Sequence, residues 1–272
     1  MDARPDAARS PGDPAAPSAL GGPLPQLLLG AVCAAYTTGA VLGWGSPRLA
    51  LAMGDFGLAA AALLAAASCL WYARRWAGEP RAAWILFGVA SLAMSLGNAI
   101  WGWYEVVEGR PVPCLTAADA CFLLFAPLAI VGLLLLAKRP VTPSGWICLA
   151  LDTWLIGGSL MTLSWSVALT QAAQRQGESV LRSALGLAYP LLDIALVSTV
   201  LVLHFRRSPA HRAAINAAIA ALALTVLCDA LFTSPVLRER YSSGQLLDAG
   251  WFAGSLLLAG ARWMGILPRS AE

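Results

Sequence analysis

Five aspartate residues interrupt or begin long apolar runs, where a charged side chain is costly. They are Asp119, Asp152, Asp193, Asp229 and Asp248, and Glu105 follows the end of a further apolar run. An aspartate at the centre of a bilayer costs about 3 kcal/mol on insertion scales, so such a side chain must face a bundle interior or water. Carboxylates in that setting bind a proton, a cation or a small basic ligand. These six residues form the first candidate ligand-binding set.

Structural roles are the alternative for four of these carboxylates. Asp119 and Asp248 begin their apolar runs, and a negative charge at a helix N-terminus is stabilised by about 0.3–1 kcal/mol, so both suit capping. For Asp152 and Asp193 the alternative is an interhelical contact that fixes the fold. No basic residue lies at the depth of Asp193. We therefore expect Asp193 to be protonated, to accept hydrogen bonds from neutral donors or to meet a cation.

Tyr189 and Pro190 precede Asp193 by about one helical turn. Proline inside a helix removes a backbone hydrogen bond and usually kinks the helix. The freed carbonyl groups would border the same cavity as Asp193, and we expect Pro190 to act as a hinge. A static kink is the alternative.

The sequence does not contain the residue patterns required for zinc binding or for the common hydrolase mechanisms. The six cysteines contain no CxxC pair, and no Cys-His cluster could hold zinc. Neither HExxH nor GxSxG occurs. Two aspartates that share a proton can cleave peptide bonds, but Asp152 and Asp193 are predicted to lie at different depths. We expect no catalytic residue, no metal and no cofactor.

The composition is typical of a polytopic membrane protein. The chain has 272 residues, of which 58% are hydrophobic and 12% charged, and its mean hydropathy is +0.68. Soluble domains carry about 25% charged residues, so a soluble enzyme is disfavoured. The net charge of +3 is spread over loops. It forms no basic patch, so we expect no nucleic-acid partner.

Apolar runs of spanning length recur after a polar N-terminal segment. The runs are Leu24–Trp44, Phe56–Ala73, Ala82–Trp103, Leu115–Ala137, Gly145–Val167, Leu185–Phe205, Ala213–Thr233 and Leu246–Leu267. They predict an all-α bundle of about eight transmembrane helices over residues 24–267, with the lipid bilayer as its main partner. Residues 1–23 are rich in Ala and Pro and predict a disordered cytoplasmic tail. Residues 268–272 form a short cytoplasmic end.

The distribution of Lys and Arg predicts the orientation in the plasma membrane. With eight spans both termini lie on one side, and that side holds twelve of these residues against six on the other. Both termini are therefore predicted to be cytoplasmic. Glu105, Asp119, Asp229 and Asp248 then gather at the outer face, with Asp193 below them.

Two pairs of glycines have the spacing that lets membrane helices approach closely. Gly39 and Gly43 form one GxxxG pair, and Gly250 and Gly254 form another. We expect them to pack helices within one chain. A homodimer through the same faces stays open as an alternative.

Short segments between residues 80 and 265 also carry a resemblance. The segments are Gly97-Asn98, Trp101, Tyr104-Glu105, Gly109-Arg110-Pro111, Ala118-Asp119, Pro127-Leu128, Leu151-Asp152, Ala188 to Asp193, Leu227-Cys228-Asp229 and Asp248 to Trp251. In order and spacing they resemble the N-terminal membrane module of actinobacterial signalling proteins that end in GGDEF and EAL domains, the makers and breakers of cyclic di-GMP. The resemblance implies a sensor that governs a cytoplasmic signalling enzyme. It adds Asn98, Trp101, Tyr189 and Trp251 to the candidate ligand-binding set.

The sequence leaves three functions open. The first is a non-catalytic sensory or regulatory module, because no GGDEF or EAL motif occurs and the nucleotide chemistry cannot be carried over. The second is a proton- or cation-coupled transporter, which intramembrane carboxylates would suit. A weak echo between Leu151-Asp152 and Leu247-Asp248, on runs of opposite direction, points the same way. The third is a membrane scaffold.

Overall fold

The computed structural model describes residues 24–75, 79–113, 115–136, 143–164, 180–205, 212–233 and 241–264. All regular secondary structure in these ranges is helical, which confirms the predicted all-α class. The α-helices are α1 (Leu24–Leu42), α2 (Pro47–Ala52), α3 (Leu58–Ala73), α4 (Glu79–Gly102), α5 (Ala117–Leu136), α6 (Pro143–Ser164), α8 (Val180–Phe205), α9 (Arg212–Thr233) and α11 (Leu246–Met264). Three short turns join them: η1 (Gly43–Gly45) is a 3₁₀ turn, and η2 (Met53–Gly57) and η3 (Trp103–Val107) are π turns.

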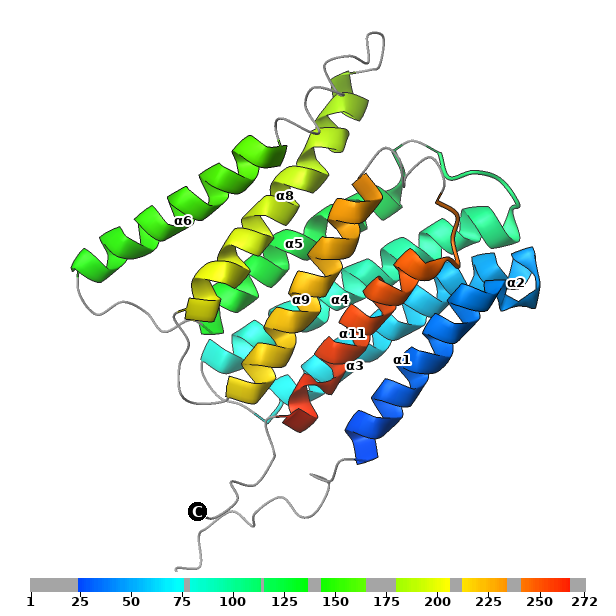
Figure 1. Cartoon of the computed structure of the whole chain (residues 1–272), viewed down its shortest axis with the longest axis horizontal. Helices are drawn as coiled ribbons and strands as arrows, with labels where there is room; N and C mark the ends of the chain where they lie inside the picture. The colour runs from blue at the N-terminus through cyan, green and yellow to red at the C-terminus, as the bar shows by residue number, and fades with distance from the viewer. Residues whose placement is uncertain are drawn as a thin grey trace, which may run out of the picture.

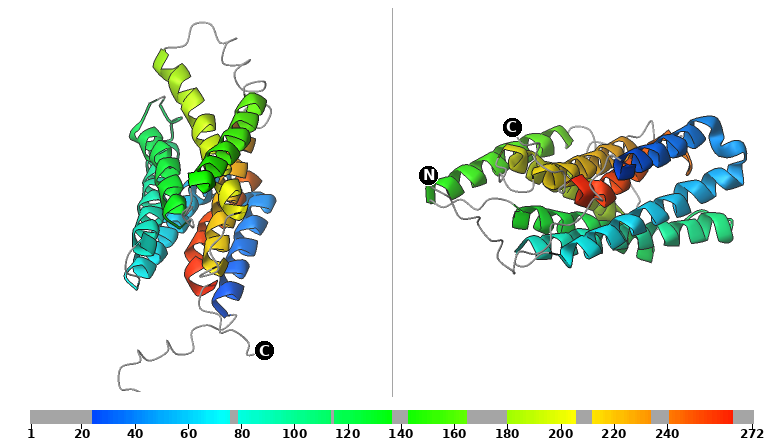
Figure 2. Two further views of the ribbon diagram at one scale, coloured as in Figure 1. Left: turned by 90° about the vertical axis from the view of Figure 1, so that its left-hand side faces the viewer. Right: turned by 90° about the horizontal axis from the view of Figure 1, so that it is seen from below.

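The long helices run up and down in two layers (Figures 1 and 2). One layer consists of α3, α4 and α5, and the other follows the order α1, α11, α9, α8, α6. Contacts of α11 with α3 and of α5 with α8 join the layers. The start of α1 and the end of α11 lie at one end of the bundle. The opposite end carries α2 and η3 and the starts of α5 and α11; we call it the acidic end.

Five helical segments are long and apolar enough to cross a membrane. They are Leu24–Gly45, Pro47–Ala73, Arg81–Val107, Ala117–Leu136 and Ala214–Phe232, and two shorter apolar stretches cover Ala188–Leu201 and Leu246–Ala261. Large apolar side chains also point away from the bundle, as Trp154 of α6 does with 80% of its surface exposed. Such a surface suits lipid. The five segments support a membrane protein, and the count of eight spans stays a prediction.

The second segment starts earlier than the sequence pattern predicted. The apolar run was expected to begin at Phe56, but helix begins at Pro47 and continues through η2 into α3. Ser46 caps this start, because its hydroxyl accepts a hydrogen bond from the backbone N–H of Leu49 (3.3 Å). The earlier start places Asp55 inside a helical segment and not in a loop. The segments 1–23 and 268–272 lie outside the described residues.

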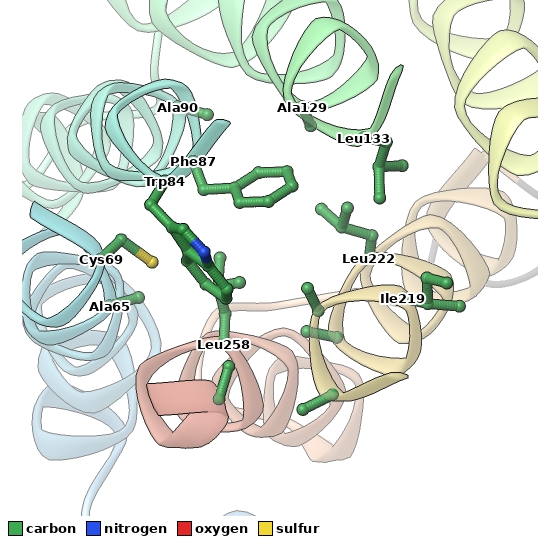
Figure 3. Packing of buried hydrophobic residues seen from close by; sticks show 14 of the residues in the cluster. Ala65, Cys69, Trp84, Phe87, Ala90, Ala129, Leu133, Ile219, Leu222 and Leu258 are labelled. Atoms are coloured by element: carbon green, nitrogen blue, oxygen red, sulfur yellow. The ribbon is translucent and has the colours of Figure 1, made fainter. Parts of the chain in front are cut away.

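Small residues let the two layers pack closely. Ala65, Ala129 and Ala259 are fully buried, each from a different helix. Trp84 and Phe87 point from α4 into the space between the layers, toward Leu258 of α11 and the labelled leucines of α5 and α9 (Figure 3). Close backbone approach filled by a few large rings is how membrane helices gain van der Waals contact. This core holds the helices that position the acidic end.

Three of the four GxxxG glycines lie at close contacts. Both GxxxG glycines of α11 face α9. A Cβ atom on Gly250 would collide with the Sγ atom of Cys228 in α9, and one on Gly254 would collide with Thr225, also in α9. Gly39 lies against the Trp44 ring. The packing role predicted for Gly43 is not found, because α1 ends at Leu42. Gly43 instead adopts a φ of +73° in η1, with open space around it.

We expect Gly250→Ala to lower the free energy of unfolding by about 1–3 kcal/mol, because the new methyl group would overpack the α9–α11 contact. Cys228→Ala should restore part of that loss in the double variant, since it removes the colliding sulfur atom. Gly30→Ala is the matched control, because no atom lies near its Cβ position. Denaturant unfolding in detergent micelles gives the free energy of unfolding of the natural protein, of the three single variants (Gly250→Ala, Cys228→Ala and Gly30→Ala) and of the double variant. Equal losses for Gly250→Ala with and without Cys228 would contradict the assigned contact.

Candidate functional site

The acidic end brings carboxyl groups together from six different helical elements. The groups belong to Asp55 (η2), Glu105 (η3), Asp119 (α5), Asp193 (α8), Asp229 (α9) and Asp248 (α11). They form two neighbouring sets. The Tyr189 group consists of Asp119, Tyr189, Asp193 and Asp229. The Asp55 group consists of Asp55, Glu105 and Asp248. Asp152 lies on α6, and its side chain is outside the described part of the structure.

Tyr189 is the centre of the first group. Its hydroxyl donates a hydrogen bond to Oδ1 of Asp119 (2.9 Å), and it interacts electrostatically with Asp229 and Asp193 as well. The carboxyl groups of Asp193 and Asp229 also interact with each other. One phenol therefore joins α8 to α5 and faces three acidic side chains.

Asp119 both caps α5 and binds Tyr189. Its Oδ2 atom accepts a hydrogen bond from the backbone N–H of Thr116 (2.8 Å). The Thr116 hydroxyl in turn accepts one from the N–H of Ala118 (3.2 Å). This is a capping box, in which two N-terminal donors of the helix are satisfied reciprocally. The capping alternative is therefore correct for Asp119, and its other oxygen is still used for the contact with α8.

Asp229 binds the indole of Trp251. The Nε1–H group of Trp251 donates to Oδ1 of Asp229 (2.9 Å), which links α11 to α9. The Trp251 ring meets Phe232 and Tyr241 edge to face, with centroids 5.8 and 6.3 Å away. This aromatic trio links the two acidic groups, so a movement of Tyr241 would reach Asp229 through the Trp251 ring.

Asp248 is fully buried, and both of its oxygens are hydrogen-bonded. Oδ1 accepts from the Tyr241 hydroxyl (2.6 Å) and Oδ2 from the N–H of Gly244 (2.5 Å). Burial, aided by the nearby charge of Asp248, raises the pKa of Tyr241 well above its usual range. The hydroxyl of Tyr241 therefore remains a donor. Asp248 reaches back over the start of α11 as a capping residue does.

The loop Tyr241–Gln245 closes over the Asp55 group. Ser243 donates to Oε2 of Glu105 (3.0 Å), and the carbonyl of Gly244 accepts from Nε1 of Trp44 (2.9 Å). The loop thus ties η3, η1 and α11 together. Trp44 adopts a φ of +57° to make this contact. A bulky residue in that region carries about 1–3 kcal/mol of strain, which the surrounding contacts must offset.

Asp55 is the acidic residue that the sequence pattern missed. It is 4% exposed, and its Oδ2 atom has no hydrogen-bond partner. Its carboxyl group lies near those of Glu105 and Asp248 and near the hydroxyl of Ser243. The sequence signal was present, since Asp55 lies between apolar residues on both sides. The predicted apolar run does not include it, because that run begins one residue later, at Phe56.

The remaining predicted residues lie in local contacts. The side-chain amide of Asn98 donates to the carbonyl of Met94 within α4 (2.9 Å). Trp101 packs at a tilt on Phe122 of α5, with centroids 6.3 Å apart. Pro190 lies within α8, which stays helical on both sides of it, so its hinge role stays a prediction.

The one ion pair within the described ranges lies on the exposed rim. Arg110 bonds Glu108, which also accepts from Nε1 of Trp103 (2.9 Å). The hydrogen bond from Arg110 lowers the pKa of Glu108 below its usual value. Both acidic groups lie apart from this pair, and their described hydrogen-bond donors are neutral: hydroxyl, indole and backbone N–H groups.

This arrangement can accept a proton or the hydrogen bonds of a cationic ligand. Interacting carboxyl groups with neutral donors carry excess negative charge, which favours uptake of positive charge. Within the described residues, no three His, Cys, Asp or Glu side chains are grouped so that they could hold a metal ion. The chain matches no protein-family model, no curated protein and no solved structure.

Proposed function

We propose that the chain is a sensory or regulatory module that crosses the plasma membrane eight times with both termini in the cytoplasm. In this proposal the acidic end lies on the outer face. It binds a proton, a cation or a small basic ligand there and signals to a cytoplasmic partner enzyme. The observation that carries the proposal is the convergence of six carboxyl groups on one end of the bundle, where their described donors are neutral.

The connections of the acidic end suggest how binding would be transmitted. Tyr189 joins α8 to α5, and Trp251 joins α11 to α9. Helix α11 runs from the acidic end to the end where α1 begins (Figure 1). A ligand that favours one packing of these helices over another would therefore change the packing at the end of α11 far from Asp248. Its effect is limited to the difference in its affinity for the two packings.

Hydrogen exchange of the full chain in lipid nanodiscs tests the proposal. We expect lower pH, or an added probe such as Na⁺, K⁺ or spermidine, to change the exchange of α11 at the end far from Asp248. Asp193→Asn should reduce that change, because it removes one of the paired carboxyl groups. Glu108→Gln is the matched control, since Glu108 lies on the rim beside Arg110. If no pH or probe changes the exchange, the proposed function is wrong.

A proton-coupled carrier is the second candidate. It is favoured by the interaction between Asp193 and Asp229 on two neighbouring helices, with Pro190 one turn from Asp193. Flux measurements in proteoliposomes separate the two candidates. Flux driven by a pH gradient and lost in Asp193→Asn would select the carrier. A ligand-dependent change in exchange without flux would select the sensor.

A further inference from the structure

Asp55 has the Ser243 hydroxyl beside its carboxyl group, but one of its two oxygens is used differently from those of Asp119, Asp229 and Asp248. Asp119, Asp229 and Asp248 each accept at least one hydrogen bond from a described donor. Oδ2 of Asp55 is buried without any partner. A buried oxygen that carries negative charge and accepts no hydrogen bond is strongly unfavourable, whereas the protonated group is neutral. Asp55 is therefore stabilised by a bound proton, which neutralises its unpartnered oxygen.

Glycine backbones make close contacts at Asp55 and at its neighbour Gly54. On one side the backbone of Gly102 approaches so closely that a Cβ atom there would lie 2.8 Å from the Cβ of Asp55. On another side Gly54 lies directly against the backbone of Ser243 and Gly244. Such close contacts favour a proton over a hydrated cation or an amine as the ligand of Asp55. A proton adds no volume to the site.

We infer that Asp55 is a proton-binding residue and that its proton holds the Tyr241–Gln245 loop closed over the acidic end. The inference rests on the proposed sensing function and deepens it, because it names the ligand and the part that moves. The step is simple protonation: a proton from the outer water binds Oδ2, and the carboxylate becomes a neutral carboxylic acid. No other bond forms or breaks.

The Tyr241–Gln245 loop responds to protonation of Asp55 because the loop is hydrogen-bonded to the two carboxyl groups next to Asp55. Ser243 is bound to Glu105, and Gly244 and Tyr241 are bound to Asp248. When Asp55 loses its proton, its charge repels both carboxyl groups. Opening the loop admits water to all three, which weakens the repulsion. The closed loop is thus favoured at low pH and is lost as the pH rises.

The titratable groups that face Asp55 come from every element packed against it. Glu105 faces it from η3 and Asp248 from α11. Two phenols face it as well, Tyr36 from α1 and Tyr241 from the loop. The Tyr36 hydroxyl donates to the carbonyl of Met53 (2.9 Å), so it is already engaged. These groups add negative charge or neutral hydroxyls, and none of them is a cation that would replace the proton.

Two measurements on the full chain in nanodiscs test the inference. Infrared spectroscopy should show the carbonyl stretch of a protonated carboxyl group in the natural protein, and Asp55→Asn should lose that band. Hydrogen exchange of residues 241–245, corrected for the intrinsic pH effect, should rise with pH by at most about tenfold per pH unit, the limit for one linked proton. Asp55→Asn resembles the protonated state, so its loop should stay protected at every pH.

Two further variants keep the result interpretable. Glu105→Gln removes a charge that repels ionised Asp55, but its side-chain oxygen can still accept the hydrogen bond from Ser243. We expect it to keep the loop transition, shifted to another pH. Glu108→Gln, on the exposed rim, should keep both the band and the transition at the original pH.

The possible failures are distinguishable. If Asp55→Asn keeps both the band and the pH-dependent loop, another group binds the proton and the inference is overturned. The proposed sensing function would survive that result, provided that pH still alters the exchange of α11. If Na⁺ or K⁺ at constant pH closes the loop and protons do not, the inference is also overturned. If neither pH nor any probe alters exchange anywhere, the proposed function fails together with it.

Discussion

Replacing Gly244 with alanine is expected to lower the free energy of unfolding by about 2–5 kcal/mol, for two reasons that add. Gly244 has a φ of +92°, which costs about 1–2 kcal/mol for a residue with a Cβ atom. The new methyl group would also collide with the backbone carbonyl of Ala50 in α2, and such overpacking costs about 1–3 kcal/mol. The collision should push the Tyr241–Gln245 loop away from α2.

Gly109→Ala is the matched control for this prediction. Gly109 also has a positive φ, +65°, but no atom lies within 4 Å of its Cβ position. It should therefore show only the backbone cost of about 1–2 kcal/mol. Denaturant unfolding in detergent micelles gives both values. If the two variants lose the same stability, the close approach of Gly244 to Ala50 contributes nothing.

Asp248→Ala is expected to lower the free energy of unfolding by about 2–4 kcal/mol. The change leaves the Tyr241 hydroxyl and the N–H of Gly244 without their acceptor, and each unsatisfied buried donor costs about 1–3 kcal/mol. Loss of the charge also relieves repulsion with Glu105, which offsets part of this cost. The lost hydrogen bonds should outweigh the relief, because Asp248 accepts both of them in a fully buried position.

Tyr241→Phe separates the two hydrogen bonds that Asp248 accepts. It removes only the bond from the phenol, for which about 1.5–3 kcal/mol is typical when one partner is charged. The bond from Gly244 and the packing of the ring on Phe232 and Trp251 are retained. Asp248→Ala should therefore be the more damaging of the two. Equal or smaller damage would show that repulsion among the carboxyl groups dominates at this site.

The functional proposals and the stability predictions concern the same few contacts. The Tyr241–Gln245 loop holds Asp248 in place, bonds Glu105 and lies against Gly54 next to Asp55. Variants that open the loop should lower stability and also remove its response to pH. Above the pH at which Asp55 loses its proton, Asp55→Asn is expected to do the opposite, because it removes a buried charge and keeps the loop closed. The direction of its effect on stability therefore provides a further check on the proton-binding inference.

The local pattern of the sequence was sufficient to predict the long helices and their order, but not α2. Each predicted apolar run overlaps one long helix of the structure, because runs of spanning length alternate with loop segments rich in Gly, Pro and Arg. Capping by Asp119 was predicted as one of two roles, because Asp119 lies at the start of its apolar run, where a helix N-terminus stabilises negative charge. The orientation, the number of spans, the ligand and the signalling partner stay predictions.

Only the tertiary structure decided which carboxyl groups share an environment. The partners of Asp119, Asp229 and Asp248 include aromatic residues, and the phenol that binds Asp119 lies 70 residues away in sequence. Neither hydropathy nor residue spacing predicts contacts between residues so far apart in sequence, because both patterns describe one helix at a time. The same holds for Asp55, which lies just before the predicted apolar run: only the packing of η2 against the Tyr241–Gln245 loop makes it a buried acid. Apolar content thus determined where helices form, and the contacts between them determined where charge is concentrated.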